Sequence, residues 1–188
     1  MAFLERLLKG IDGFSLRLVW LSGTLLILAA FMVTIDVIVR KLFGVTMAGS
    51  DEITGYAFGI SIMLSLSYAI IHRSNIRIDA AYQHMPKIVR AILDIFGMIL
   101  LVTFIGFVAY RGWFLLLDSY EYGSRAITPL RTPLAIPQTI WFFGMAFAVF
   151  TGAVLILIGL GGLLKGDWKL INERMGIPTV DEQIEDET

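Results

Sequence analysis

Four long apolar stretches alternate with shorter polar segments along this chain. The clearest covers residues 53–71 and holds no charged side chain, with Asp51 and Glu52 just before it and His72 and Arg73 just after it. About 20 apolar residues, each rising ~1.5 Å in a helix, cross a hydrocarbon core ~30 Å thick, where a helix satisfies its own backbone hydrogen bonds. Similar stretches are found at about 18–39, 91–110 and 138–164. The pattern therefore predicts an all-α membrane protein with four transmembrane helices.

The segments around this four-helix transmembrane domain (18–164) predict surface elements. Residues 1–17 place apolar side chains at helical spacing with charges between them, which is typical of an amphipathic helix in the membrane interface; the alternative is a soluble extension of the first span. Residues 72–90 are basic with one apolar side and predict a surface-lying elbow between the second and third spans. We expect residues 112–131 to form a mixed loop and residues 165–188 to form a polar, partly disordered tail.

The distribution of basic residues predicts the orientation in the membrane. Ten of the lysines and arginines lie on the N-terminal segment, the second connection and the tail, and five lie on the first and third connections. Short loops rich in Lys and Arg stay in the cytoplasm. Both termini and the second connection are therefore predicted to be cytoplasmic, and the first and third connections to face the opposite side.

Composition removes several classes of protein from consideration. The chain is 57% hydrophobic and 16% charged with a net charge of −1, which excludes a disordered chain and gives no basic surface for nucleic acid. It has no cysteine, and His72 and His84 are too few for an all-histidine metal site. His72, Asp79 and His84 are the only conceivable set for a lipid-modifying enzyme, and their spacing matches no known catalytic arrangement. We expect no enzymatic activity.

Charged side chains avoid the middle of every predicted span. Asp36 lies four residues before Arg40, so the two can pair on one helix face. They form either a self-satisfied pair that sets the depth of the helix or a contact with a partner subunit or lipid headgroup. Asp51 and Glu52 either complement the helix dipole or form part of a docking surface outside the membrane.

The second span also carries small residues at helical spacing. Small residues let two helix backbones approach closely in lipid, and hydroxyl groups can bond to a neighbouring helix. This pattern predicts a packed face without naming its partner. The residues concerned are Gly55, Gly59, Ser61 and Ser65.

An ordered set of short motifs resembles a known family. The motifs are Asp36–Gly44, Ser50–Tyr56, Ser67–Ala69, His72–Asp79 and Thr132–Trp141. In this order, with four spans, they resemble the small membrane subunit (DctQ type, or small permease) of tripartite ATP-independent periplasmic (TRAP) transporters. The resemblance covers roughly residues 11–164.

The resemblance implies a non-catalytic scaffold subunit in a bacterial inner membrane. In that family a large membrane subunit carries the substrate and sodium sites and moves like an elevator, and the small subunit braces it. A periplasmic binding protein delivers an organic acid, such as a C4-dicarboxylate or the sugar acid sialic acid, and sodium symport drives uptake. We expect no cofactor in this chain, with sodium on the large subunit, and the membrane location leaves room for a bound phospholipid.

The resemblance also suggests which residues meet each partner. Packing against the large subunit would use the small-residue face that includes Gly55, Gly59, Ser61 and Ser65. Docking of the binding protein on the periplasmic side would use Asp36, Arg40, Asp51, Glu52, Asp118, Glu121, Arg125 and Arg131. The alternative function is a self-sufficient small transporter or channel that assembles as a homo-oligomer, with a polar path built from hydroxyls and end charges.

Overall fold

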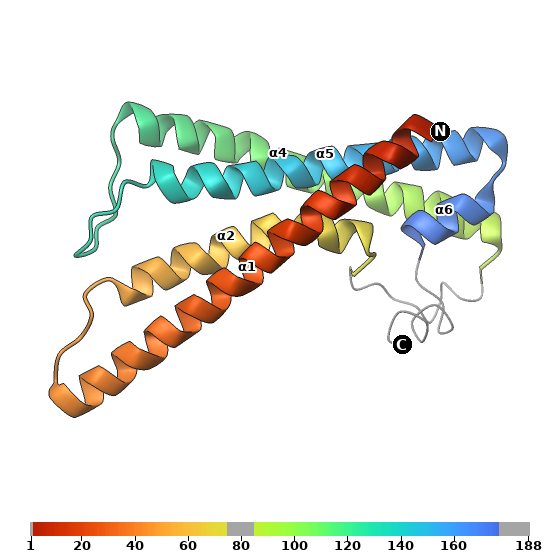
Figure 1. Ribbon diagram of the computed structural model, residues 1–188. Coiled ribbons are helices and arrows are strands. Elements are labelled where there is room, and N and C mark those ends of the chain that lie inside the picture. The colour runs from red at the N-terminus through yellow and green to blue at the C-terminus, as the bar shows by residue number, and fades with distance from the viewer. Residues whose placement is uncertain (1, 75–84, 177–188) are drawn as a thin grey trace.

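The computed structural model describes residues 2–74 and 85–176, and this part of the chain folds as a bundle of helices (Figure 1). Four helices each contain an apolar window long enough to cross a membrane, which confirms the prediction of four spans. A fifth, short helix follows them. The helices are α1 (Ala2–Phe43), α2 (Ser50–Ile71), α4 (Lys87–Glu121), α5 (Ala135–Lys165) and α6 (Trp168–Met175).

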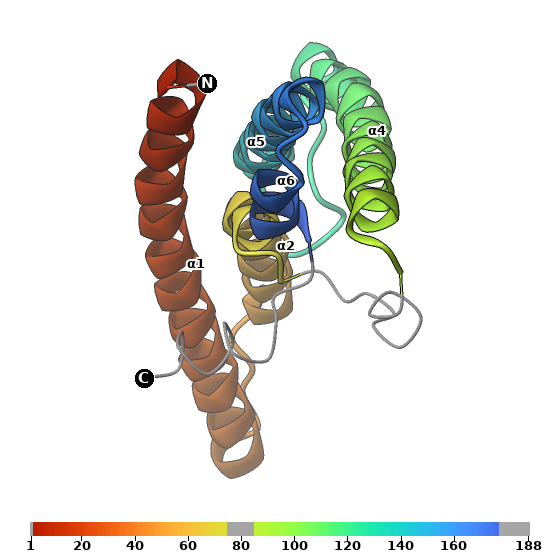
Figure 2. The ribbon, with the colours of Figure 1, turned by 90° about the vertical axis from the view of Figure 1, so that its right-hand side faces the viewer.

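The helices place the connections at two opposite ends of the bundle (Figure 1). Residues 44–49 and 122–134 lie at one end, called here the loop end. The N-terminus, the end of α2 and helix α6 lie at the other, called here the terminal end. Viewed from the terminal end, α1 and α4 form the two edges, with α2, α5 and α6 between them (Figure 2). The side of the membrane that each end faces stays a prediction.

Helix α1 is continuous from Ala2 to Phe43, with no break between the amphipathic segment and the first span. At ~1.5 Å per residue its length is about 63 Å, roughly twice the hydrocarbon thickness. Its buried seam recurs every seven residues, the spacing that keeps one face against a partner helix. The interfacial position predicted for residues 1–17 stays a prediction. The residues of the heptad seam are Leu8, Ser15, Ser22, Ala29 and Asp36.

Helix α5 lies at the centre of the bundle, between α2 on one side and α4 and α6 on the other. It meets α2 at Gly144, where an added Cβ would lie 2.7 Å from the carbonyl carbon of Met63. Only a glycine lets the two backbones come this close. Ala148, Leu155 and Ile158, on the same helix, are completely buried or nearly so and belong to the main core.

Helix α4 extends to Glu121 and so includes much of the segment predicted as a mixed loop. The reason lies in its buried face, where Gly112, Leu116 and Ser119 continue the helical spacing. The indole ring of Trp141 on α5 packs over Gly112. Arg111, just past the span predicted at about 91–110, is an exposed side chain on the helix surface and does not interrupt the helix.

The predicted tail contains the packed helix α6, which hydropathy did not reveal. The Asp167 carboxylate caps α6 by accepting a hydrogen bond of 3.1 Å from the Leu170 amide. Ile171 and Met175 are completely buried and lie against Gly162 and Gly159 of α5. Disorder predicted for the final residues, and most of the predicted elbow, fall on positions 177–188 and 75–84, outside the described residues.

Candidate functional site

The loop end carries a hairpin-like turn between α4 and α5, here called the hairpin (residues 124–134). The Ala126 amide donates to the Thr132 carbonyl at 3.0 Å, and the Leu134 amide donates to the Ser124 carbonyl at 3.0 Å. Arg131 adopts a left-handed backbone conformation (φ 49°) that turns the chain back. The hairpin is therefore a hydrogen-bonded structure that holds its side chains in fixed positions.

Asp36 organises the other connection at the loop end. Although α1 is largely exposed, this carboxylate is buried, with 1% relative exposure. It forms an ion pair with Arg40, whose side chain is 53% exposed. It also accepts hydrogen bonds from the Met47 amide at 2.5 Å and from the Thr46 hydroxyl at 3.2 Å. Asp36 therefore fastens residues 46 and 47 to the end of α1, and its contacts are satisfied inside the chain.

Glu52 joins α2 to the hairpin. Its carboxylate accepts a hydrogen bond from the Thr128 hydroxyl, 76 positions away in sequence, and one of 3.0 Å from the Tyr56 hydroxyl. Gly49 adds a second contact, because the Leu130 side chain occupies the space where its Cβ would lie. The hairpin is thus tied to α2 by the polar contacts of Glu52 with Thr128 and Thr132 and by the apolar contact of Leu130.

We expect Thr128→Val to loosen the hairpin without disturbing the helices. Valine keeps the shape of threonine and removes one of the hydroxyls from which Glu52 accepts a hydrogen bond. Hydrogen exchange of the Ala126 amide should become about threefold to tenfold faster, as befits the loss of one partly exposed hydrogen bond to a charged acceptor. Thr24→Val is the matched control, because that hydroxyl bonds only to its own helix, at the Trp20 carbonyl. Equal exchange in both variants would contradict the tether.

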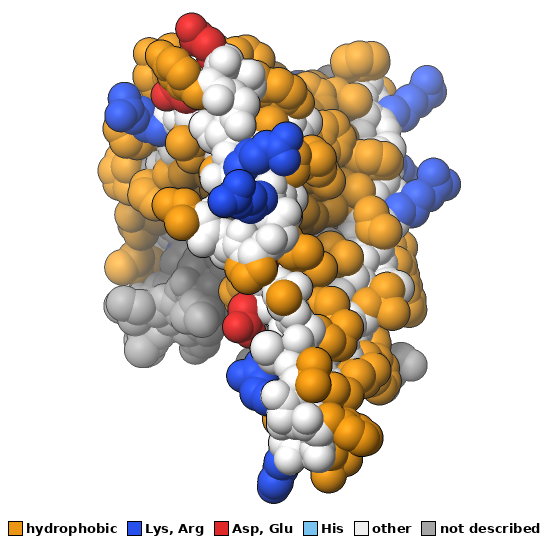
Figure 3. Space-filling view, turned by 90° about the vertical axis from the view of Figure 1, so that its left-hand side faces the viewer, with side chains coloured by type: hydrophobic (Ala, Val, Ile, Leu, Met, Phe, Trp, Pro, Cys, Tyr) orange, Lys and Arg blue, Asp and Glu red, His pale blue; other side chains and the backbone are white. Residues whose placement is uncertain are grey.

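The remaining residues predicted to dock a partner are exposed. Viewed onto the loop end, basic side chains lie in the middle of the face and also toward its left, right and lower edges, acidic side chains lie above and below the central ones, and hydrophobic side chains lie around them (Figure 3). The structure thus divides the predicted set. Three residues, Asp36, Arg40 and Glu52, hold the loop end together, and five project from it: Asp51, Asp118, Glu121, Arg125 and Arg131.

The predicted packing face of α2 is divided in a similar way. Ser61 is buried and donates to the Ser22 carbonyl of α1 at 3.1 Å, so its packing is internal to the chain. Ser65 donates to the Ser61 carbonyl of its own helix at 2.8 Å. Gly55 and Gly59, by contrast, have no atom within 4 Å of an added Cβ and so leave an open surface.

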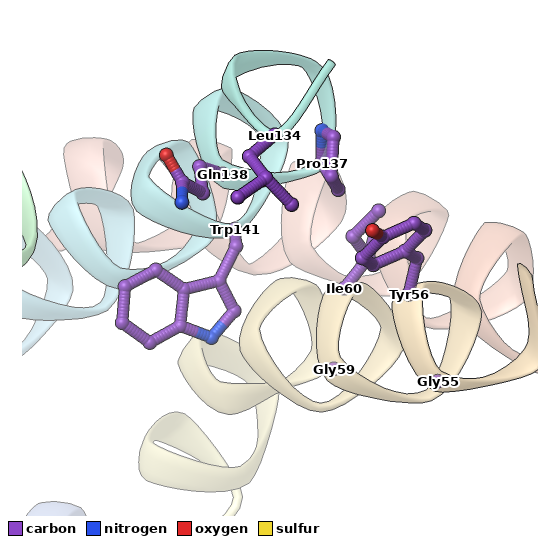
Figure 4. Close-up of a pocket in the computed structure, with 8 residues that line it drawn as sticks. All are labelled: Gly55, Tyr56, Gly59, Ile60, Leu134, Pro137, Gln138 and Trp141. Atoms are coloured by element: carbon purple, nitrogen blue, oxygen red, sulfur yellow. The ribbon is translucent and has the colours of Figure 1, made fainter. Parts of the chain in front are cut away.

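Gly55 and Gly59 form one wall of a pocket of about 170 Å³ between α2 and the start of α5. Trp141 and Pro137 of α5 form the opposite wall (Figure 4). The Gln138 side chain also lines it, and its buried carbonyl oxygen has no hydrogen-bond partner. The pocket is apolar apart from a few polar groups, which suits it to a side chain or chain segment from outside.

Chemistry-bearing groups at the terminal end are engaged in contacts between helices. The His72 ring nitrogen lies 2.9 Å from the Asp12 carboxylate of α1, and the ring stacks on Tyr68. Arg174 of α6 pairs with Glu5 of α1 at 2.8 Å. Within the described ranges, no group of three or more His, Asp or Glu side chains could hold a metal ion. Asp79 and His84 lie outside those ranges.

The sequence analysis did not predict the roles of three residues that hold the hairpin and the helices together. Thr128 and Leu130 hold the hairpin, and Gly144 sets the approach of α2 to α5. A hydroxyl or a leucine in a loop carries no pattern that names its partner. The signal for Gly144 was a glycine inside an otherwise apolar helix, a position that often marks close backbone approach in membranes.

Comparison with known protein families shows what this chain is similar to. The family described as "Tripartite ATP-independent periplasmic transporters, DctQ component" matches residues 29–160. The comparisons with curated proteins and with solved structures find no match. The matched region begins within α1 and ends within α5, so it contains both connections of the loop end and the pocket between α2 and α5.

Proposed function

This chain belongs to the DctQ family and is a multi-pass membrane component of a tripartite transporter, and from this premise we propose that it is a non-catalytic scaffold subunit. It braces a large, elevator-type membrane subunit that carries the substrate and sodium sites. A periplasmic binding protein delivers organic acids, dicarboxylates or sugar acids, to that subunit. The chain lies in a bacterial inner membrane with both termini in the cytoplasm.

The observation that carries this proposal is how hydroxyl groups in the spans are used. Thr24, Thr34 and Thr151 each donate to a carbonyl one turn earlier in their own helix. Ser61 and Ser65 also donate to helix carbonyls. These hydroxyls bond back to helix backbones, the hydroxyls of Ser22 and Ser67 are buried inside the bundle, and the buried acids Asp36 and Asp94 lie toward helix ends rather than at mid-span. Such a chain is suited to bracing a transporter rather than conducting substrate.

Two surfaces support a large membrane partner. The α2–α5 pocket presents Gly55 and Gly59 to the outside, so a neighbouring helix can approach closely there (Figure 4). Helix α1 buries little of its most apolar window inside the chain, and large side chains such as Trp20 and Phe31 are exposed. We place the large subunit on the pocket side. Close approach of a helix requires small residues such as Gly55 and Gly59, whereas contact with lipid does not.

The experiment that tests the scaffold role is reconstitution with and without this chain. Proteoliposomes holding the large subunit and a sodium gradient, with binding protein and labelled organic acid outside, should take up substrate only when this chain is present. We expect uptake to fall at least about tenfold without it, because an unbraced elevator loses its fixed support. Full uptake by the large subunit without this chain would refute the proposal.

Liposomes that hold only this chain separate the scaffold from the self-sufficient transporter. The scaffold role predicts uptake at the level of empty liposomes, and a homo-oligomeric transporter predicts uptake above it. The scaffold role also predicts that the chain co-purifies with the large subunit in mild detergent. Recovery of this chain alone as a discrete oligomer would favour the alternative.

A further inference from the structure

The hairpin encloses a notch that the contacts described so far do not use. The notch has a volume of about 500 Å³ and is open to the outside. Arg125 and Arg131 both line it, one before and one after the turn that contains Thr128 and Pro129. The notch thus brings two arginine side chains together around one small hollow.

Two arginines around one hollow favour a carboxylate. A guanidinium group is planar and always charged, and it binds a carboxylate through two parallel hydrogen bonds. Both arginine side chains are exposed, so their charges are available to a ligand. An acidic group in the notch could accept hydrogen bonds from both sides.

The notch is held open by the contacts that anchor the hairpin. Backbone hydrogen bonds fix Ala126 and Leu134, and the Thr128–Glu52 contact ties the turn to α2. Because the arginines project from an ordered frame, a ligand does not have to order the loop on binding. This pre-organisation distinguishes the hairpin from a loop that only carries charge.

One observation favours a soluble protein as the source of the carboxylate. Ile127, which also lines the notch, is fully exposed with 105% relative exposure. An apolar side chain beside two charges matches a protein surface that offers an apolar patch next to an acid, whereas a small organic acid would leave Ile127 uncovered.

We propose that the notch between Arg125 and Arg131 binds an aspartate or glutamate side chain of the periplasmic binding protein, and that Ile127 packs against an apolar patch beside that acid. This proposal rests on the function proposed above and assigns the docking contact to the hairpin. Asp36 and Glu52 act here as positioning residues, because their own bonds are made inside the chain.

The test measures docking on the assembled membrane complex. The complex of this chain with the large subunit is placed in nanodiscs at physiological ionic strength, and its Kd for the purified binding protein is measured by biolayer interferometry. We expect the Kd to rise at least about tenfold for R125A/R131A. It should rise by a smaller factor for R125K/R131K, because lysine keeps the positive charge and lacks the planar guanidinium group that donates two parallel hydrogen bonds. Ile127→Ser should also raise the Kd.

Lys41→Ala is the matched control, because it removes a positive charge from an exposed position at the end of α1, outside the hairpin. We expect it to change the Kd less than about twofold, since charges beyond about 8 Å are screened at this ionic strength. The variants must assemble with the large subunit in wild-type amount. If the double alanine variant assembles poorly, the Kd of R125K/R131K tests the proposal instead.

Three results would overturn the proposal. The first is an unchanged Kd for R125A/R131A in a complex that still transports; in that case the scaffold role stands and the docking contact lies elsewhere. The second is an effect seen only in nanodiscs of anionic lipid, which would show that the arginines bind headgroups. The third is competition by succinate that requires both arginines, which would show that the notch takes the free organic acid.

Discussion

Replacing Gly144 with leucine should prevent α2 from packing on α5, and Gly144→Ala should weaken that packing measurably. An added Cβ at this position would lie 2.7 Å from the carbonyl carbon of Met63, 2.8 Å from its oxygen and 2.9 Å from the Leu64 amide nitrogen. These atoms belong to a helix backbone, so no side-chain rotation can relieve the contact. Overpacking of this kind costs about 1–3 kcal/mol for the alanine variant and more for leucine.

The measurement is the free energy of unfolding in mixed detergent micelles, followed by circular dichroism and by the fluorescence of tryptophans that include Trp141. Gly97→Ala is the control, because Gly97 is exposed on α4 and has no atom within 4 Å of an added Cβ. It should be neutral or stabilising by up to about 1 kcal/mol, since alanine favours the helix. Equal losses in both variants would show that α2 and α5 do not depend on Gly144.

Asp36→Ala should release the connection between α1 and α2. The carboxylate is buried and accepts hydrogen bonds from Met47 and Thr46 as well as from Arg40. Its removal leaves the Met47 amide without its acceptor. Hydrogen exchange at that amide should become more than about tenfold faster, the factor expected when a hydrogen bond to a charged acceptor is lost.

Arg40→Ala distinguishes the hydrogen bonds of Asp36 to Thr46 and Met47 from its ion pair with Arg40. In this variant Met47 and Thr46 keep their acceptor, so exchange at the Met47 amide should stay close to wild type. Asp36→Asn should fall between the two, because an amide oxygen still accepts but carries no charge. If Arg40→Ala and Asp36→Ala accelerated exchange equally, the ion pair would be the main contact and the fastening role would be wrong.

Only some of the contacts of Asp36 could be predicted from the sequence. The four-residue spacing was enough to propose a pair with Arg40, and the structure confirms that pair. The bonds to Thr46 and Met47 could not be predicted, because they depend on how the chain turns after Phe43. The structure shows the pair within this chain, and a contact of the half-exposed Arg40 with a partner subunit or a lipid headgroup stays a prediction.

The sequence by itself determined the four spans, the position of charges along them and the family. Hydropathy gave the four spans, because the hydrocarbon core acts on each apolar stretch separately. Charge position placed the acids and bases outside the middle of each span, and the ordered motifs gave the family, which the match over residues 29–160 confirms. The end of α4 was not predicted because Arg111 and Asp118 interrupt its apolar run. Helix α6 was not predicted because its few apolar residues, such as Ile171 and Met175, are buried by neighbouring helices rather than by lipid.

Contacts between distant residues were decided only by the tertiary structure. Glu52 meets Thr128 across 76 positions, Gly144 meets the backbone of Met63, and Ser61 turns inward to Ser22 rather than outward. The sequence records that these side chains are acidic, small or hydroxylated. Which of them meet depends on the crossing of helices and the course of a hairpin, because packing selects partners by shape among many residues of the same chemistry.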